Sequence, residues 1–472
     1  MGIRRTASAV LVTAAATMIA TTATVAPAGA ASAAPTFTVV DLGLVKKTHG
    51  SGAVAVSANG TYAALQSNWP SYPQQATRYH SGHLKTLGTL GGVDSQAYGV
   101  DNAGQVVGSA RDAAQLGRAF EYSGTTLMQL PDLGGDTSAA EAVNDHGLIV
   151  GTAAVAGGSD PRAVEWTNGQ ISVLPGLGPS SIAGAQAVNE AGDAAGYSWN
   201  AQNSLPEHAI LWRAGQPVDV SPSPFVGSEA YGLNAQDVVV GGTCVQTTNP
   251  CTDGAWITAD GVSDGYQMAT GGPSGIATAI NDHWMIVGRG QLPNQVWEPW
   301  VMFNGQRYDL NSLLAPGTTG WQITQPVGVN NLGDIIATAN DTATNQGHAV
   351  LLVPTAAPAY DRTAPTGTVT LAAGAASTSS PTVPLVAAGS DPSGIFAVRI
   401  SNKGTLSSTD HRLVKGVTVA AAQASASTPL SWNLADPATG GTGATGTHTV
   451  WVQWLDWAGN WSKPISAKIT LS

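Results

Sequence analysis

The chain has 472 residues, of which 10% are charged and 57 are glycine, and its formal net charge is −11 at pH 7. The acidic balance disfavours nucleic acid and anionic membranes as partners, because both repel a negatively charged protein. The length suggests two or more domains. Abundant glycine together with few charges is typical of secreted β-structure with many turns.

Residues 1–33 have the order of features expected of a secretory signal peptide. Arg4 and Arg5 supply positive charge, residues 7–20 form a short apolar core, and small residues suited to cleavage follow within 28–33. The apolar core is too short to span a bilayer as a stable helix. We therefore predict a secreted protein without a membrane span. Ordinary secretion fits the residues after the arginine pair better than a twin-arginine signal does.

A hairpin-like motif recurs along the next three hundred residues. In its clearest copy, EAVNDHGLIVGTA at 141–153, small apolar residues precede a tight turn and a short apolar run ends in glycine. Seven copies are present, spaced by 43 to 49 residues, and they open their turns at Ser57, Asp101, Asn144, Asn189, Asn234, Asn281 and Asn330. A period of this length predicts a repeat array or a propeller.

Each repeat contains four short stretches rich in β-branched or aromatic residues and bounded by Gly, Asn and Asp, which is typical of strands. Four short antiparallel strands per repeat make one propeller blade. Asn and Gly in the turns are good hairpin formers, so we interpret them as structural. Large third-strand residues are interpreted as core between blades, namely Tyr122, Trp166, Trp212 and Phe303.

The two ends of the repeat region complement each other. The seventh repeat has no fourth strand of its own, whereas Thr36–Leu42 resembles a fourth strand with no repeat before it. Pairing this segment with His348–Val353 closes the ring and removes two open sheet edges. We therefore predict a seven-bladed β-propeller over residues 36–354.

The elements LGTLGG (87–92) and LPDLGG (130–135), with the VN-x-x-G-x-x-VG and HA-x-x-W patterns, resemble the HAF-type extracellular repeat proteins of bacteria. The resemblance covers about residues 36–355. The first and last repeats match least well, and Asp237 replaces the turn glycine in the fifth. The resemblance implies secretion and a β-propeller-like array, and it carries over no catalytic residue, because the family has no established activity.

Loop lengths separate two faces of the predicted ring. The first-to-second and third-to-fourth connections are tight and form a tight-turn face, and the longer, variable connections form a long-loop face. Variable loops on a rigid scaffold are where binding usually occurs. Aromatic residues interrupt these polar loops and suit stacking on sugar rings or docking on a protein, although some could instead pack under loops. The candidate ligand-binding residues are Trp69, Tyr72, Trp199, Trp297 and Trp321.

Ionisable residues on the long-loop face leave an enzymatic alternative open. Two carboxylates could serve glycoside hydrolysis, but the sequence does not determine which of them meet across a ring. No nucleophile elbow, zinc motif or EF-hand loop is present, so we expect no metal and no cofactor. His208 and His348 share a repeat position with Arg118 and Arg162, which favours a structural role. The candidate carboxylates are Asp94, Asp112, Asp136, Asp160, Glu207, Glu229, Asp253, Glu298 and Asp341.

The chain has two cysteines, Cys244 and Cys251, both on the long-loop face. In an oxidising compartment we predict that they form a disulfide that holds one loop.

Residues 355–363 have the composition of a linker, and residues 364–472 predict a small immunoglobulin-like β-sandwich. The stretches at 391–404 and 452–462 resemble bacterial immunoglobulin-like modules, whose late strand runs into a D-x-x-G-N turn. Asp456, Gly459 and Asn460 match that turn. Trp457 and Trp461, which lie in it, are candidates for exposed aromatics.

Together these features predict an all-β, secreted and monomeric protein that binds without catalysis. Its partner is an extracellular polymer, such as carbohydrate, or a protein. The first alternative is a polysaccharide lyase or glycosidase acting on the long-loop face, which requires two or three ionisable groups at one place. The second is a structural or protein-interaction module of the cell envelope.

Overall fold

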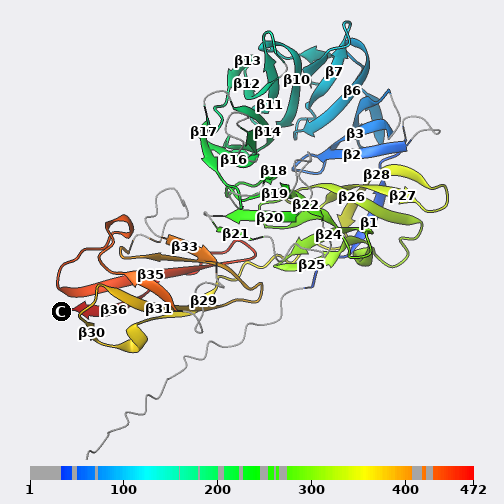
Figure 1. Ribbon diagram of the computed structural model, residues 1–472. Coiled ribbons are helices and arrows are strands. Elements are labelled where there is room, and N and C mark those ends of the chain that lie inside the picture. The colour runs from blue at the N-terminus through cyan, green and yellow to red at the C-terminus, as the bar shows by residue number, and fades with distance from the viewer. Residues whose placement is uncertain are drawn as a thin grey trace, which may run out of the picture.

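The computed structural model describes residues 33–44, 50–69, 73–158, 160–178, 181–199, 207–222, 227–244, 254–259, 262–264, 274–404, 406, 417–420 and 429–472. These residues are almost entirely β-strands and turns, in four-stranded antiparallel sheets followed by a two-sheet module (Figure 1). This confirms the prediction of an all-β, propeller-like fold. Among the described residues, no helix combines the length and apolar character needed to cross a membrane.

Each sequence repeat forms one four-stranded sheet, numbered here in chain order. Sheet 1 contains β2 (Gly50–Val56), β3 (Tyr62–Trp69), β4 (Gln75–His80) and β5 (His83–Thr86). Sheet 2 contains β6 (Gly91–Val100), β7 (Val106–Asp112), β8 (Gly117–Tyr122) and β9 (Leu127–Gln129). Sheet 3 contains β10 (Gly134–Val143), β11 (Ile149–Val155), β12 (Pro161–Thr167) and β13 (Gln170–Val173). Sheet 4 contains β14 (Ile182–Val188), β15 (Ala194–Trp199), β16 (His208–Arg213) and β17 (Gln216–Asp219).

The remaining sheets follow the same pattern. Sheet 5 contains β18 (Gly227–Leu233), β19 (Val239–Cys244), β20 (Gly254–Ala259) and β21 (Val262–Asp264). Sheet 6 contains β22 (Gly275–Ile280), β23 (Ile286–Gln291), β24 (Trp297–Phe303) and β25 (Gln306–Asp309), followed by the short helix η2 (Leu310–Leu313). Sheet 7 contains β26 (Trp321–Val329), β27 (Ile335–Asp341), β28 (Gln346–Pro354) and, from the N-terminus, β1 (Phe37–Asp41).

The N-terminal strand completes sheet 7, as the sequence predicts. β1 pairs antiparallel with β28, with Phe37 opposite Pro354 and Asp41 opposite Val350. Sheet 7 also packs against sheet 1, where the amide of Ala349 donates to Ser51 Oγ at 2.9 Å. The row of sheets therefore closes on itself, and β1 lies beside β28 in Figure 1.

The contact between Ala349 and Ser51 recurs between other neighbouring sheets. A serine on an innermost strand accepts a hydrogen bond from the amide of a third-strand alanine in the preceding sheet. The other donor–acceptor pairs are Ala76 with Ser95, Ala119 with Ser138, and Ala209 with Ser228, at 2.9–3.0 Å. Because these alanines are fully buried against the next sheet, a larger side chain has no room there. This explains the small residue that recurs in the third strand.

The third-strand aromatics are buried between sheets, as interpreted from the sequence. Tyr122, Trp166, Trp212 and Phe303 are among the most buried side chains of the molecule. The indole Nε1 of Trp166 donates to the carbonyl of Pro131, and the equivalent nitrogen of Trp212 donates to Pro175. Hydrogen-bonded indoles of this kind fill the widening gaps between sheets without leaving a buried donor unpaired.

Each innermost strand carries a β-bulge at the same repeat position. The ladder between the first and second strands skips one residue, three positions before the turn, in all seven sheets. A bulge turns its extra residue out of the regular alternation. The seven extra residues are all half-buried: Val54, Tyr98, Glu141, Gln186, Tyr231, Thr278 and Val327.

The C-terminal module consists of two facing sheets. One contains β29 (Thr366–Leu371), β31 (Thr382–Ser390) and β34 (Leu430–Asn433), and the other contains β30 (Ser377–Thr378), β36 (Ile465–Leu471), β35 (Gly446–Asp456), β32 (Ile395–Ser401) and β33 (Val417–Ala420). The short helices η3 (Ala372–Gly374) and η6 (Pro437–Thr439) lie in its connections. Its core includes Leu385, Ile400, Val452 and Trp454.

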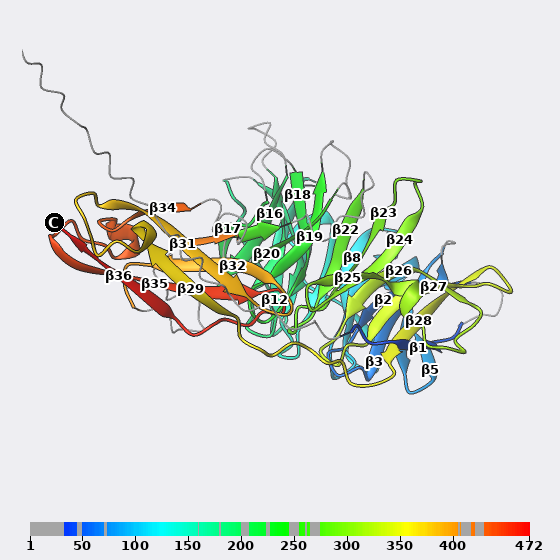
Figure 2. The same cartoon turned by 90° about the horizontal axis from the view of Figure 1, so that it is seen from below.

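The module packs against one side of the ring, as Figures 1 and 2 show. Trp284, from the tight turn of sheet 6, belongs to the same buried cluster as Phe396 and Trp457 of the module. Its ring meets Phe396 edge-on at 5.5 Å, and Phe396 meets Trp457 at 4.8 Å. Trp457 is therefore buried in this contact, whereas the half-buried Trp461 lies 3.9 Å from the guanidinium of Arg399.

The segment predicted to be a linker lies on the tight-turn face. The hydroxyl of Tyr360 accepts from Asn281 Nδ2 at 3.2 Å, and its ring stacks on His283 at 4.3 Å. Trp284 occupies the repeat position of the turn glycine, with φ of 57° and only 3% of its surface exposed. A bulky residue in this region of φ is strained, and here the strain accompanies the docking of the module.

Candidate functional site

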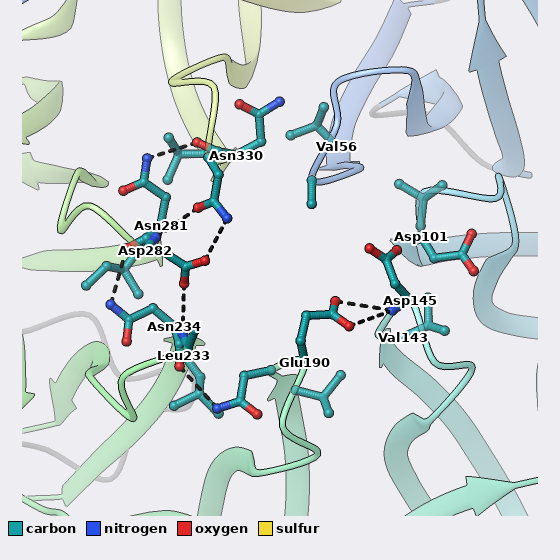
Figure 3. Close-up of a pocket in the computed structure, with 18 residues that line it drawn as sticks. Val56, Asp101, Val143, Asp145, Glu190, Leu233, Asn234, Asn281, Asp282 and Asn330 are labelled. Atoms are coloured by element: carbon teal, nitrogen blue, oxygen red, sulfur yellow. Dashed lines mark hydrogen bonds between the residues drawn. The ribbon is translucent and has the colours of Figure 1, made fainter. Parts of the chain in front are cut away.

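The tight-turn face holds a ring of asparagine side chains around the axis (Figure 3). Asn234 Oδ1 accepts from the amides of Gln236 and Val238 in its own turn, both at 3.0 Å. Its Nδ2 donates to the carbonyl of Asn281 in the next sheet at 3.2 Å. The same inter-sheet bond joins Asn144 to Asn189, Asn189 to Asn234, Asn281 to Asn330, and Asn330 to Ser57.

The next residue of each turn forms a second set of contacts around the ring. The amide of Asp145 donates to the carboxylate of Glu190, the amide of Ala235 to Asp282, and the amide of Asp282 to Asn331 Oδ1. These side chains border a central cavity of about 220 Å³. Because the acidic oxygens at this face already accept amide hydrogens from neighbouring turns, we interpret the tight-turn face as structural.

The predicted ligand-binding aromatics lie at the opposite end of the strands. Trp199 ends β15 and is 39% exposed, and Trp297 begins β24 and is 37% exposed. The guanidinium of Arg289 lies 4.8 Å from the centre of the Trp297 ring. Trp321 begins β26, is half-buried, and packs edge-on against His348 at 5.2 Å.

The other predicted residues of this face are only partly covered by the structure. Trp69 ends β3, and its side chain is outside the described residues, as is all of Tyr72. Cys244 ends β19. Its side chain and all of Cys251 lie outside the described residues, so the disulfide stays a prediction.

The two histidines at the shared repeat position have the structural role that the sequence favoured. His208 Nδ1 lies 2.8 Å from Asp219 Oδ2 in the fourth strand of sheet 4. His348 Nδ1 lies 3.0 Å from Asp41 Oδ1 in β1, the equivalent strand of sheet 7. Arg118 occupies the same position in sheet 2 and pairs with Asp112 and Asp132. These contacts join third strands to their surroundings.

A cluster of ionisable groups lies near the long-loop end of the axis. Glu229, on β18, is only 2% exposed, and its Oε2 accepts from the hydroxyl of Tyr231 at 2.6 Å. The carboxyl of Glu207, which precedes β16, is close enough to hydrogen-bond to that of Glu229. Tyr197, on β15, packs over Gly184, where an added Cβ would lie 2.7 Å from its ring. Glu141 supplies a further carboxyl from the bulge of β10.

The protonation of this cluster follows from its burial. Burial, with the neighbouring Glu229 as a second cause, raises the pKa of Glu207 to about 8. Burial also raises the pKa of Glu141 to about 7. Glu229 Oε1 is buried and has no hydrogen-bond partner among the described residues. Burial, and then the three carboxyls, raise the pKa of the Tyr197 hydroxyl above its ordinary value.

The raised pKa values of Glu207 and Tyr197 favour the neutral forms of both groups, which can donate hydrogen bonds. Tyr197 and Trp199 share one face of β15, so the exposed Trp199 indole lies next to the cluster.

The sequence marked Glu207 and Glu229 as carboxylates of this face but did not show that they meet. It missed Tyr197, Tyr231 and Glu141. Glu141 and Tyr231 could have been found from their position in the repeat, because both occupy the β-bulge three residues before the turn. Elsewhere in the described residues, one group of three carboxylates could hold a metal ion, in and beside the C-terminal module.

Comparisons with known proteins add little to this description. No protein-family model matches the chain, and no curated protein matches it. A gluconolactonase from Xanthomonas campestris aligns with 70% of this chain and 98% of its own, at 11% identity and a TM-score of 0.32. The extracellular domain of a putative hybrid two-component system from B. thetaiotaomicron aligns with 93% of this chain and 57% of its own, at 10% identity and a TM-score of 0.38.

A fungal alcohol oxidase of the AA5 family, in complex with copper, aligns with 93% of this chain and 100% of its own, at 10% identity and a TM-score of 0.29. Scores at this level carry no argument about fold or activity. The description of the fold therefore rests on the sheets of this chain and on the contacts between them.

Proposed function

We propose that the chain is a secreted, monomeric binding protein that recognises an extracellular polymer, such as carbohydrate, through its long-loop face. The seven sheets are then the blades of one propeller of HAF-type repeats, followed by an immunoglobulin-like sandwich. The observation that carries the proposal is the exposed Trp199 indole beside the polar cluster of Tyr197, Glu207 and Glu229. A flat aromatic surface next to convergent polar groups is the usual composition of a sugar-binding site.

The charge of the whole chain restricts the polymer. Its formal net charge is −11 at pH 7. An acidic polysaccharide would be repelled by the chain, whereas a neutral or amine-bearing one would not. The proposed ligand class is therefore a neutral or basic extracellular polysaccharide.

The experiment is a pull-down of the mature protein with insoluble neutral glycans, chitosan and bacterial cell walls. The supernatant is assayed for released sugar ends. Trp199→Ala is expected to weaken binding about tenfold or more, because stacking and apolar burial of one indole contribute about 1.5–3 kcal/mol. Leu332→Ala, which changes an exposed apolar side chain of the tight-turn face, is the matched control and is expected to bind normally.

Each outcome separates the alternatives. Binding without release of sugar ends supports the proposal. Release of sugar ends would favour a glycosidase or lyase, for which the clustered ionisable groups are the specific observation, and Glu207→Gln would then be expected to abolish it. Failure of the wild-type protein to bind any of these polymers would contradict the proposal and favour a module that binds protein in the cell envelope.

A further inference from the structure

Three aspartates converge where the chain leaves the ring and enters the C-terminal module. Asp361 precedes β29, Asp391 follows β31, and Asp456 ends β35. One oxygen of each lies within 4.8 Å of the others. Asp456 is fully buried, Asp391 is 6% exposed, and Asp361 is half-buried.

The hydrogen bonds around these carboxylates leave two oxygens without a donor. Both oxygens of Asp456 are satisfied, Oδ1 by the amides of Ala458 and Asn460 and Oδ2 by Asn460 Nδ2. Asp391 Oδ1 accepts from the amide and hydroxyl of Ser393.

Asp361 Oδ1 likewise accepts a hydrogen bond, from the amide of Thr363. The remaining Oδ2 atoms of Asp361 and Asp391 are buried and have no hydrogen-bond partner among the described residues.

Within the part of the chain that the structure describes, no cationic side chain forms an ion pair with the cluster. None of the ion pairs found among the described residues includes Asp361, Asp391 or Asp456. Buried carboxylates are costly unless a proton or a cation neutralises them. The cluster therefore requires one or the other, and the two unpartnered oxygens show where it must lie.

We propose that Asp361, Asp391 and Asp456 bind a divalent cation, and that Ca²⁺ is the cation whose chemistry fits best. All three ligands are hard carboxylate oxygens, which Ca²⁺ prefers, and Ca²⁺ tolerates the irregular geometry that carboxylates from three separate segments impose. Oδ2 of Asp361 and of Asp391 are the free ligand atoms, and water molecules complete the shell. The sequence predicted no metal site here, because these residues form no recognisable motif.

The cation joins the segment before β29 to the turn after β35. These two segments already touch, because Asn460 Nδ2 donates to the carbonyl of Asp361 at 3.1 Å. The next residue after Asp456 is Trp457, which packs with Phe396 in the cluster that includes Trp284 of the ring. A cation at the aspartates therefore fixes the module at the place where it docks on the ring. This role is independent of the ligand that the long-loop face recognises.

The test uses the full mature chain at pH 7.5, after treatment with chelator and dialysis. Calorimetric titration with CaCl₂ is expected to show one site, in the range of about 10⁻⁴–10⁻³ M or tighter that is typical of extracellular modules. Saturating Ca²⁺ is expected to raise the melting temperature by about 5 °C, by mass action on the folded state. MgCl₂ at equal ionic strength is expected to give a smaller shift.

Two variants test whether the aspartates form the site. Asp391→Asn is expected to abolish both the binding heat and the shift, and Asp361→Asn, at the less buried position, serves if the first variant does not fold. Asp160→Asn makes the same charge change at an exposed position and is expected to retain both. The absence of any Ca²⁺ effect on the wild-type protein would overturn the proposal and assign a shared proton to the cluster. Retention of the effect in both cluster variants would overturn it as well.

Discussion

The asparagine ring gives the sharpest test of how the repeats are held together. Asn234→Asp keeps Oδ1, which accepts the two amide bonds within the turn, but replaces the Nδ2 donor with an oxygen that faces the carbonyl of Asn281. The lost bond costs about 1 kcal/mol, and the buried, unpaired oxygen costs about 1–3 kcal/mol more. The position is only 2% exposed, so the new charge cannot reach water. The expected loss of stability at pH 7 is about 2–4 kcal/mol.

The repeat also supplies the reverse substitution as a control. Asp101 occupies the same position in sheet 2, and burial raises the pKa of its carboxyl. Asp101→Asn removes that buried charge and adds a donor toward the carbonyl of Asn144, so it is expected to stabilise the protein by about 1 kcal/mol. The two variants should therefore shift stability in opposite directions although each exchanges the same two side chains.

The assay is urea unfolding of both variants and wild type at pH 7, followed by tryptophan fluorescence. Repetition at pH 5 adds a second check. An aspartate at position 234 has a folded-state pKa raised by burial, so its penalty grows as the pH rises above the unfolded value of about 3.9. The reasoning is refuted if Asn234→Asp unfolds within 0.5 kcal/mol (about the noise of such comparisons) of wild type, or if both variants shift stability in the same direction.

Two further substitutions test the acidic cluster and the docking contact. The pKa of Glu207 is raised to about 8 in the folded protein, so wild type is expected to lose stability as the pH rises from the ordinary glutamate pKa of 4.5 through 8. Glu207→Gln is expected to reduce that slope, because the raised pKa of Glu141 still contributes to it. Glu165→Gln, the control in β12, should retain the full slope, and equal slopes in both variants would contradict the assignment. Trp284→Gly relieves a strained φ of 57° but leaves a cavity against Phe396 and Trp457, so a net loss of about 2–4 kcal/mol is expected. Calorimetry should then show the C-terminal module melting earlier, and an unchanged or higher melting temperature would show that the contact contributes nothing.

Sequence periodicity predicted the parts of this fold that depend on local chemistry. The turn asparagines recur because each supplies an acceptor for its own turn and a donor for the next sheet, and an amide side chain carries both. The strand before the first repeat was recognisable because the seventh repeat lacks one.

The candidate site depends on contacts that periodicity does not contain. Glu207 and Glu229 belong to different sheets, and they meet because the amide of Ser228 bonds to the carbonyl of Glu207. The sequence marks Trp284 as unusual, because the other six copies of the turn have a smaller residue at this position. Its partner Phe396 lies in the C-terminal module, and the repeat pattern does not reveal it. Such pairs are set by the closure of the ring and by docking, and no single repeat encodes them.

The pairing of β1 with β28 has a consequence for the order in which the molecule is built. Thr38 and Val353, which bond across this pair, are 315 residues apart in the chain. β1 is therefore synthesised first but cannot pair until β28 has been made. Contacts between residues so far apart in the sequence form slowly. A truncation that ends within β28 would leave both β1 and β27 with an unpaired edge. Loss of this one strand therefore opens the ring where the two ends of the repeat array meet.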